Sequence, residues 1–135
     1  MKLTVSTVIN KNIKTVWNSF NNPEHIVQWN FAHESWRCPA SNNDLKVGGK
    51  FNHRIEAKDG SFGFNFEGEY TLVNEYNQMN YLLADDRMVS ITFKEEGTQT
   101  IITEVFETEN ENPIELQQSG WQAILNNFKA YTEST

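Results

Sequence analysis

The sequence predicts an α+β fold in which a curved antiparallel sheet packs around one long C-terminal helix. Three observations support this prediction. An alternating strand is followed by two short helical segments, several strands joined by short turns come next, and the chain ends in an uninterrupted amphipathic helix. A chain of 135 residues has the usual size of one domain, so we expect residues 1–135 to form a single domain.

The N-terminal part predicts one strand and two short helices between the first and second strands. Apolar side chains alternate along residues 2–9, as a half-buried strand requires. They then recur at helical spacing over Ile13–Phe20, with Asn10 or Asn12 as the N-cap. The segment Asn22–Glu24 supplies a capping side chain, a proline and an acid, and therefore predicts the start of a second helix.

The next stretch, residues 30–47, has no sustained period. Its polar run Ser41–Asp44 is typical of a loop. Trp36 and Cys38 leave a brief strand open as an alternative. Together with the two short helices, this stretch is expected to close the wider end of the space between the sheet and the C-terminal helix.

Strand patterns dominate from residue 50 to residue 108. In the segment 50–57 one face carries Phe51, His53, Ile55 and Ala57. Asp59-Gly60 then indicates a hairpin. The returning strand places its larger side chains at every second position, namely Phe62, Phe64, Phe66, Tyr70 and Leu72, with Gly68 in the same series. Gly63 and Gly68 would permit a bulge or a sharp bend there.

Three further strands are expected over residues 81–84, 89–93 and 98–108, joined by turns at Asp85–Arg87 and Glu96-Gly97. Consecutive strands with short connections form an antiparallel meander. No parallel crossover is required.

The last segment predicts one helix of about 28 Å at 1.5 Å per residue. It begins at the cap-then-proline pair Asn112-Pro113, and Gly120 is the one breaker before Tyr131. Its inward stripe is Gln117, Trp121, Ile124, Leu125 and Phe128. One narrow helix does not fill the concave face of a curved sheet, so we expect a cavity between the two.

Several segments resemble the bacterial relatives of the C-terminal domain of the Hsp90 ATPase activator. They are Val16-Trp17, Asn22–His25, Asp44–Phe51, Gly68–Tyr70, Asp85–Arg87 and Glu115–Lys129 with Gly120-Trp121. That family belongs to the START-like, Bet v 1-like superfamily, and the resemblance implies a helix-grip fold with an apolar cavity. Similar proteins are often described as polyketide cyclase-like or lipid-transport-like.

Composition restricts the partners. Eleven Lys and Arg against 18 Asp and Glu give a formal charge of -7, which disfavours binding to nucleic acid or to an anionic membrane surface. No apolar stretch approaches the ~20 residues of a membrane span. Cys38 is the single cysteine and no secretory signal is evident, so we expect a cytoplasmic protein, either a monomer or a weak homodimer. The spacing of His25, His33 and His53 matches no metal motif, and no cofactor is expected.

The candidate ligand contacts are mostly aromatic: Trp121, His53, Phe51, Phe64, Phe66, Tyr81, Trp29 and Leu125. His53 either hydrogen-bonds a ligand or is a core histidine satisfied by a backbone group or water. Trp121 either contacts ligand or only packs in the core. We expect the carboxylates of Glu67 and Glu69 to face water. We expect Asp85 and Asp86 to form a turn.

These patterns favour noncatalytic binding of a small hydrophobic ligand, which could be lipid-like, aromatic or polyketide-like. An enzyme of the cyclase or hydrolase type, acting on such a ligand, is the first alternative. The second is a module that docks on a chaperone of the Hsp90 type. No sequence motif supports the enzyme alternative.

Overall fold

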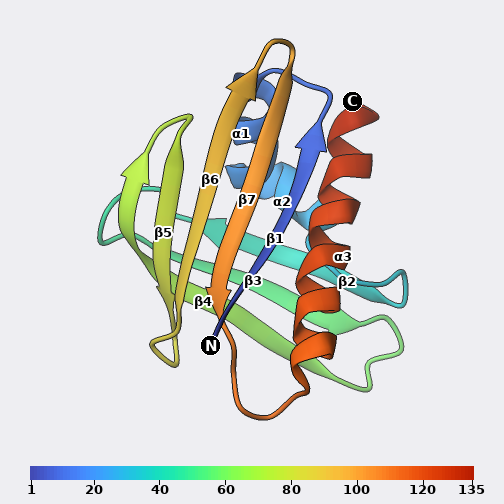
Figure 1. The fold of residues 1–135 in the computed structure, drawn as a ribbon. Helices are drawn as coiled ribbons and strands as arrows, with labels where there is room; N and C mark the ends of the chain where they lie inside the picture. Colours follow the sequence, from blue (N-terminus) through green and yellow to red (C-terminus); the bar gives the residue numbers. More distant parts are fainter.

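The computed structural model describes residues 1–135 and contains seven strands and three helices (Figure 1). In chain order these are β1 (Lys2–Ile9), α1 (Ile13–Asn21), α2 (Pro23–Trp29), β2 (Trp36–Asn43), β3 (Lys50–Ala57), β4 (Gly63–Asn74), β5 (Gln78–Leu83), β6 (Met88–Glu96), β7 (Gln99–Glu107) and α3 (Ile114–Glu133). The predicted α+β class, the two short helices after the first strand and the long C-terminal helix are confirmed.

All seven strands form one antiparallel sheet in the order β1-β7-β6-β5-β4-β3-β2. The first and last strands of the chain therefore meet, with Val5 paired to Glu104 and Ile9 to Thr100. The sheet is strongly bent, because β2, β3 and β4 run across the direction of β1, β7 and β6, while α3 lies alongside β1 (Figure 1). The predicted curved sheet around a single helix is thus the observed arrangement.

The caps of the short helices follow the sequence pattern. Asn12 Oδ1 accepts a hydrogen bond from the Thr15 backbone N at 2.9 Å, so Asn12 is the cap of α1 and Asn10 is not. Asn22 Oδ1 accepts from the Glu24 backbone N at 3.0 Å, and Pro23 opens α2 as predicted. Each contact satisfies one of the free N–H groups of a helix start.

The prediction of a loop at Ser41–Asp44 is wrong for its first three residues, which belong to β2. Their polar side chains find partners on neighbouring elements. Ser41 Oγ lies 2.8 Å from His53 Nδ1, and Asn43 bonds to the backbone oxygen of Asn21 and to the hydroxyl of Tyr70. Tertiary contacts therefore stabilise a strand that local propensity disfavours.

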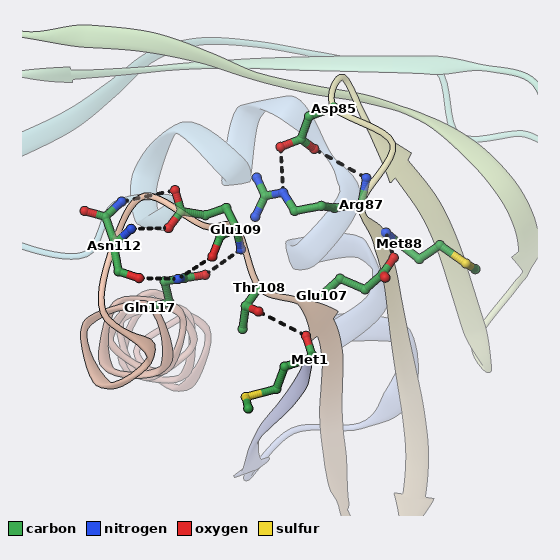
Figure 2. Close-up of polar contacts among 9 residues, drawn as sticks. All are labelled: Met1, Asp85, Arg87, Met88, Glu107, Thr108, Glu109, Asn112 and Gln117. Atoms are coloured by element: carbon green, nitrogen blue, oxygen red, sulfur yellow. Dashed lines mark hydrogen bonds and ion pairs between the residues drawn. The ribbon is translucent and has the colours of Figure 1, made fainter.

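The prediction that Asn112 caps the last helix is also wrong, because the cap position of α3 is Pro113 and no side chain bonds there. Asn112 instead turns toward Glu109, whose carboxylate accepts from the Asn112 backbone N at 2.8 Å (Figure 2). Gln117 Nε2 donates to the Asn112 and Glu109 carbonyls at 2.8 and 3.1 Å. A side chain inside the helix thus anchors the preceding loop.

The bend of β4 arises at a different place from the one predicted. The register of β4 and β5 shifts between Tyr70 and Leu72, which marks a bulge and leaves Leu72 38% exposed rather than on the inner face. Gly68 has another role. A Cβ atom at this position would lie 2.5 Å from the Leu82 carbonyl oxygen and 2.9 Å from the Phe51 ring. The absence of a side chain lets Phe51 lie directly over the strand.

Rings hold α1, α2 and the C-terminal half of α3 together. Phe128 is fully buried and meets Phe20 and Trp29 edge-on, with ring centroids 5.1 and 4.8 Å apart. Phe93 of β6 joins Phe20 and Trp17 at 5.4 and 4.9 Å. This end of the molecule is a packed aromatic core.

The contact at Gly68 can be tested by substitution. We expect Gly68→Ala to lower the free energy of unfolding by about 1–3 kcal/mol, since the new methyl group collides with backbone and ring atoms. Gly120→Ala is the matched control, because nothing lies within 4 Å of its Cβ position and alanine favours a helix by up to about 1 kcal/mol. Urea denaturation of both variants measures the difference. Equal stability of the two variants would contradict this account of Gly68.

Candidate functional site

A cavity of about 640 Å³ lies between the concave face of the sheet and the N-terminal half of α3. Twenty-six residues line it, of which 15 are hydrophobic. The size and the apolar wall are typical of sites for small organic molecules. The cavity exists because the rings around Phe128 fill only one end of the space beneath the helix.

The floor of the cavity is an aromatic cluster centred on Phe51. Its ring lies 4.8 Å from that of Tyr81, 5.3 Å from Tyr70 and 5.9 Å from Phe66. On the opposite side, Trp121 of α3 stacks on Phe106 at 4.1 Å with an interplanar angle of 7° and approaches Phe66 at 6.1 Å. Trp121 therefore belongs both to the core and to the cavity wall.

Seven of the eight predicted contact residues line the cavity: Trp121, His53, Phe51, Phe64, Phe66, Tyr81 and Trp29. Phe64 is 42% exposed and forms a cluster with Trp36 and Phe62, so it lies at the mouth rather than inside. Leu125 does not line the cavity, because its side chain is buried in the core of α3 and the sheet. Helical spacing put Trp121 and Leu125 on one stripe, but the cavity ends between them.

His53 lies on the inner face of β3, where strand alternation placed it. Its Nδ1 is 2.8 Å from Ser41 Oγ, and its ring stacks on Phe51 at 5.1 Å. Burial lowers the pKa of His53 to about 4, so the imidazole is neutral at physiological pH. The partner of Nδ1 is thus a side chain, and Nε2 has no hydrogen-bond partner in the protein.

Tyr70 and Tyr81 differ in their hydrogen bonding. The hydroxyl of Tyr70 donates to Asn43 Oδ1 at 2.5 Å, and Asn43 in turn donates to the backbone oxygen of Asn21. Tyr81 is 6% exposed, and its hydroxyl has no partner in the protein. The Tyr81 hydroxyl is therefore a free donor in the wall of the cavity.

Sequence reasoning missed Glu104 of β7, which is 6% exposed and lines the same cavity. No hydrogen bond or ion pair reaches its carboxyl group, and burial alone raises its pKa to about 8. A signal was present, because Glu104 alternates with the buried residues Ile102 and Phe106. A carboxylate within an inward-facing strand series is the pattern that would have identified it.

Charged side chains gather at the mouth of the cavity, on the β5–β6 turn and on the loop before α3 (Figure 2). Arg87 Nε pairs with Asp85 at 2.7 Å, and the Asp85 carboxylate also accepts from the Arg87 backbone N at 3.3 Å. This confirms Asp85 as a turn-forming residue. Glu109 and Glu111 of the loop before α3 also line the cavity.

The remaining candidates lie away from the cavity. Glu67 and Glu69 do not line it. Cys38 is buried, and desolvation raises the pKa of its thiol to about 11. The structure contains no group of three or more side chains that could hold a metal ion, and none of its helices has the length and apolar character needed to span a bilayer.

Residues 10–133 match the model of the family described as activator of Hsp90 ATPase homolog 1-like protein. The chain belongs to this family. An AHSA1-like protein from Aeromonas hydrophila is 40% identical with a TM-score of 0.93, and the alignment covers 99% of this chain and 93% of that one. A protein from Cytophaga hutchinsonii is 47% identical with a TM-score of 0.85, covering 98% and 92%. The predicted family and its START-like superfamily are thereby confirmed.

A more distant protein shares the architecture alone. This Chromobacterium violaceum protein is 21% identical, with a TM-score of 0.87 and 98% coverage of both chains. Curated protein sequences gave no significant match. Membership of this family therefore establishes the fold, and the argument for function must rest on the geometry of the cavity.

The buried acid makes a prediction about stability. The folded protein keeps a proton on Glu104 up to about pH 8, whereas the unfolded chain loses it at a much lower pH. The free energy of unfolding should therefore fall as the pH rises toward 8, by up to about 1.4 kcal/mol per pH unit. Glu104→Gln should remove this slope between pH 6.5 and 8, a window in which folded His53 stays neutral.

Urea denaturation of both proteins across that window measures the effect. If the free energy of unfolding varies with pH in the same way for the wild type and Glu104→Gln, this carboxyl group is already ionised in the folded state.

Proposed function

We propose that this protein binds a small hydrophobic molecule in the cavity between the sheet and α3. The observation that supports this best is the aromatic lining, in which Phe51, Phe66, Tyr81 and Trp121 surround one volume of about 640 Å³. Burial of apolar ligand surface against these rings would supply the affinity, at about 25 cal/mol per Å². His53 or a tyrosine hydroxyl would fix the orientation of the ligand.

The arrangement of the two ends of α3 supports binding over simple core packing. The C-terminal half is held by Phe128 against Phe20 and Trp29, which form the end wall of the cavity, so this end of the helix stays in place without the residues of the aromatic floor. Trp121 and Phe66 meet with their rings 6.1 Å apart, and the space beside them is free. A ligand can occupy it without moving the elements that hold the fold.

Binding can be measured by titrating the protein with fatty acids, flavonoids and polyketide-like compounds while following tryptophan fluorescence. We expect a saturable change with at least one class, and a tenfold or larger loss of affinity in Trp121→Ala because a large apolar contact is removed. Leu116→Ala is the matched control on the same helix, since Leu116 is 57% exposed and lies outside the cavity. A panel without any saturable response would overturn the proposal.

The description of the family suggests a second role, docking on a chaperone of the Hsp90 type. We propose this role as one that uses the outer surface of the domain and leaves the cavity free. A pull-down with purified Hsp90 tests this role. Binding should be abolished by charge reversal at Glu67 and Glu69, which belong to β4 and lie outside the cavity. Binding should persist in Trp121→Ala. Absence of binding to the wild type would remove this role.

A further inference from the structure

Two polar side chains in the cavity wall have no partner in the protein. Glu104 and Tyr81 are each 6% exposed, both line the cavity, and no hydrogen bond reaches either side chain. Their oxygen atoms are not among the fully buried unpaired atoms of the protein, so they open into the cavity, where a ligand can hydrogen-bond them. The Tyr70 hydroxyl and His53 Nδ1 differ from them, because each already bonds to a side chain of β2, Asn43 and Ser41 respectively.

Strand register places the two groups on the same concave face. Glu104 pairs across the sheet with Val5 and Ile91, so its neighbours on both adjoining strands are aliphatic. Tyr81 of β5 lies two strands away and one inner-face row further along, opposite Val89. Glutamate and tyrosine are both long, and the charge of Glu104 acts on the Tyr81 hydroxyl strongly enough to contribute to its raised pKa.

We propose that the ligand of this cavity is a ring-containing carbonyl compound, whose carbonyl oxygen accepts hydrogen bonds from the Glu104 carboxyl group and the Tyr81 hydroxyl. This inference rests on the proposed ligand-binding function and specifies its ligand class. The aromatic floor around Phe51 would receive the rings, and the two O–H groups would receive the oxygen.

The chemistry of the site favours a neutral acceptor over a charged ligand. Burial keeps Glu104 protonated at neutral pH, so its carboxyl group offers an O–H donor to a carbonyl oxygen without any buried charge. A carboxylate ligand would need desolvation in an apolar cavity, and the one cation of the lining, Arg87, already pairs with Asp85 and is outnumbered by Glu109 and Glu111. An ammonium ligand would require ionisation of Glu104 among aliphatic neighbours, which costs more than a neutral hydrogen bond.

A matched set of naphthalenes carrying an acetyl, ethyl, aminomethyl or carboxyl group at the same ring carbon tests this directly. Calorimetric titration of the wild type should give an affinity for the acetyl compound about tenfold higher than for the ethyl compound, which has nearly the same shape without the acceptor. Tyr81→Phe and Glu104→Leu should each reduce this ratio toward one and leave the affinity for the ethyl compound unchanged or higher. Glu104→Leu is expected to fold, since it replaces an unpaired acid among apolar neighbours.

The pH profile identifies the group that donates. The affinity of the wild type for the acetyl compound should fall as the pH rises through about 8. In Glu104→Gln, whose side chain keeps a hydrogen-bond donor and does not titrate, this affinity should not change with pH. The other titratable side chains of the wall remain in that variant: His53, Tyr70 and Tyr81 on the sheet, His33 after α2, and Arg87, Glu109 and Glu111 at the mouth. A profile that persists in Glu104→Gln therefore belongs to one of these and contradicts the inference.

The outcomes separate the two proposals. Equal binding of the acetyl and ethyl compounds, or tightest binding of the aminomethyl compound with affinity rising toward pH 8, would overturn the carbonyl inference and leave the apolar binding function standing. Failure of all four compounds to bind would overturn both.

Discussion

The C-terminal half of α3 is fixed by an aromatic cluster, in which Phe128 packs against Phe20 of α1 and Trp29 of α2 and those two rings also contact each other, while β1 lies alongside the helix. All three rings are buried, and the Trp29 indole N–H donates to the Ser19 carbonyl at 2.9 Å, which fixes the direction of that ring. The two short helices therefore hold α3 at one end. The opposite half of α3 spans the concave sheet without being packed on all sides, and this difference between its ends creates the cavity.

Periodicity was sufficient to predict most of the fold. The switch from alternation in residues 2–9 to helical spacing, and the long unbroken segment before Tyr131, correspond to β1, α1 and α3 with small shifts at their ends. The predictions that failed depended on contacts between distant residues. A strand at Ser41–Asn43 forms because His53, Tyr70 and Asn21 accept or donate hydrogen bonds there, and no local pattern contains that information.

The site was predictable to the extent that it follows strand alternation. His53, Phe51 and Phe66 were placed correctly on the inner face, because each lies in a regular strand. The bulge after Tyr70 reverses the facing of the later residues of β4, so Leu72 turns outward although it continues the same series. Leu125 shows a different limit, since a helical stripe identifies the inward side without showing where packing ends and open space begins.

Glu104 is the residue at which stability and function diverge. Its position between Ile102 and Phe106, with Val5 and Ile91 opposite, would be filled with lower free energy by an aliphatic side chain. Violations of local consistency of this kind are concentrated at functional sites. In the proposed complex the carboxyl group would gain its partner from the ligand. The same argument applies to the Tyr81 hydroxyl, and it distinguishes both groups from the Tyr70 hydroxyl and His53 Nδ1, whose partners are already in place. Under the proposed function, the apolar rings would supply the affinity for a ligand, and the two unpaired groups would select among ligands of similar shape.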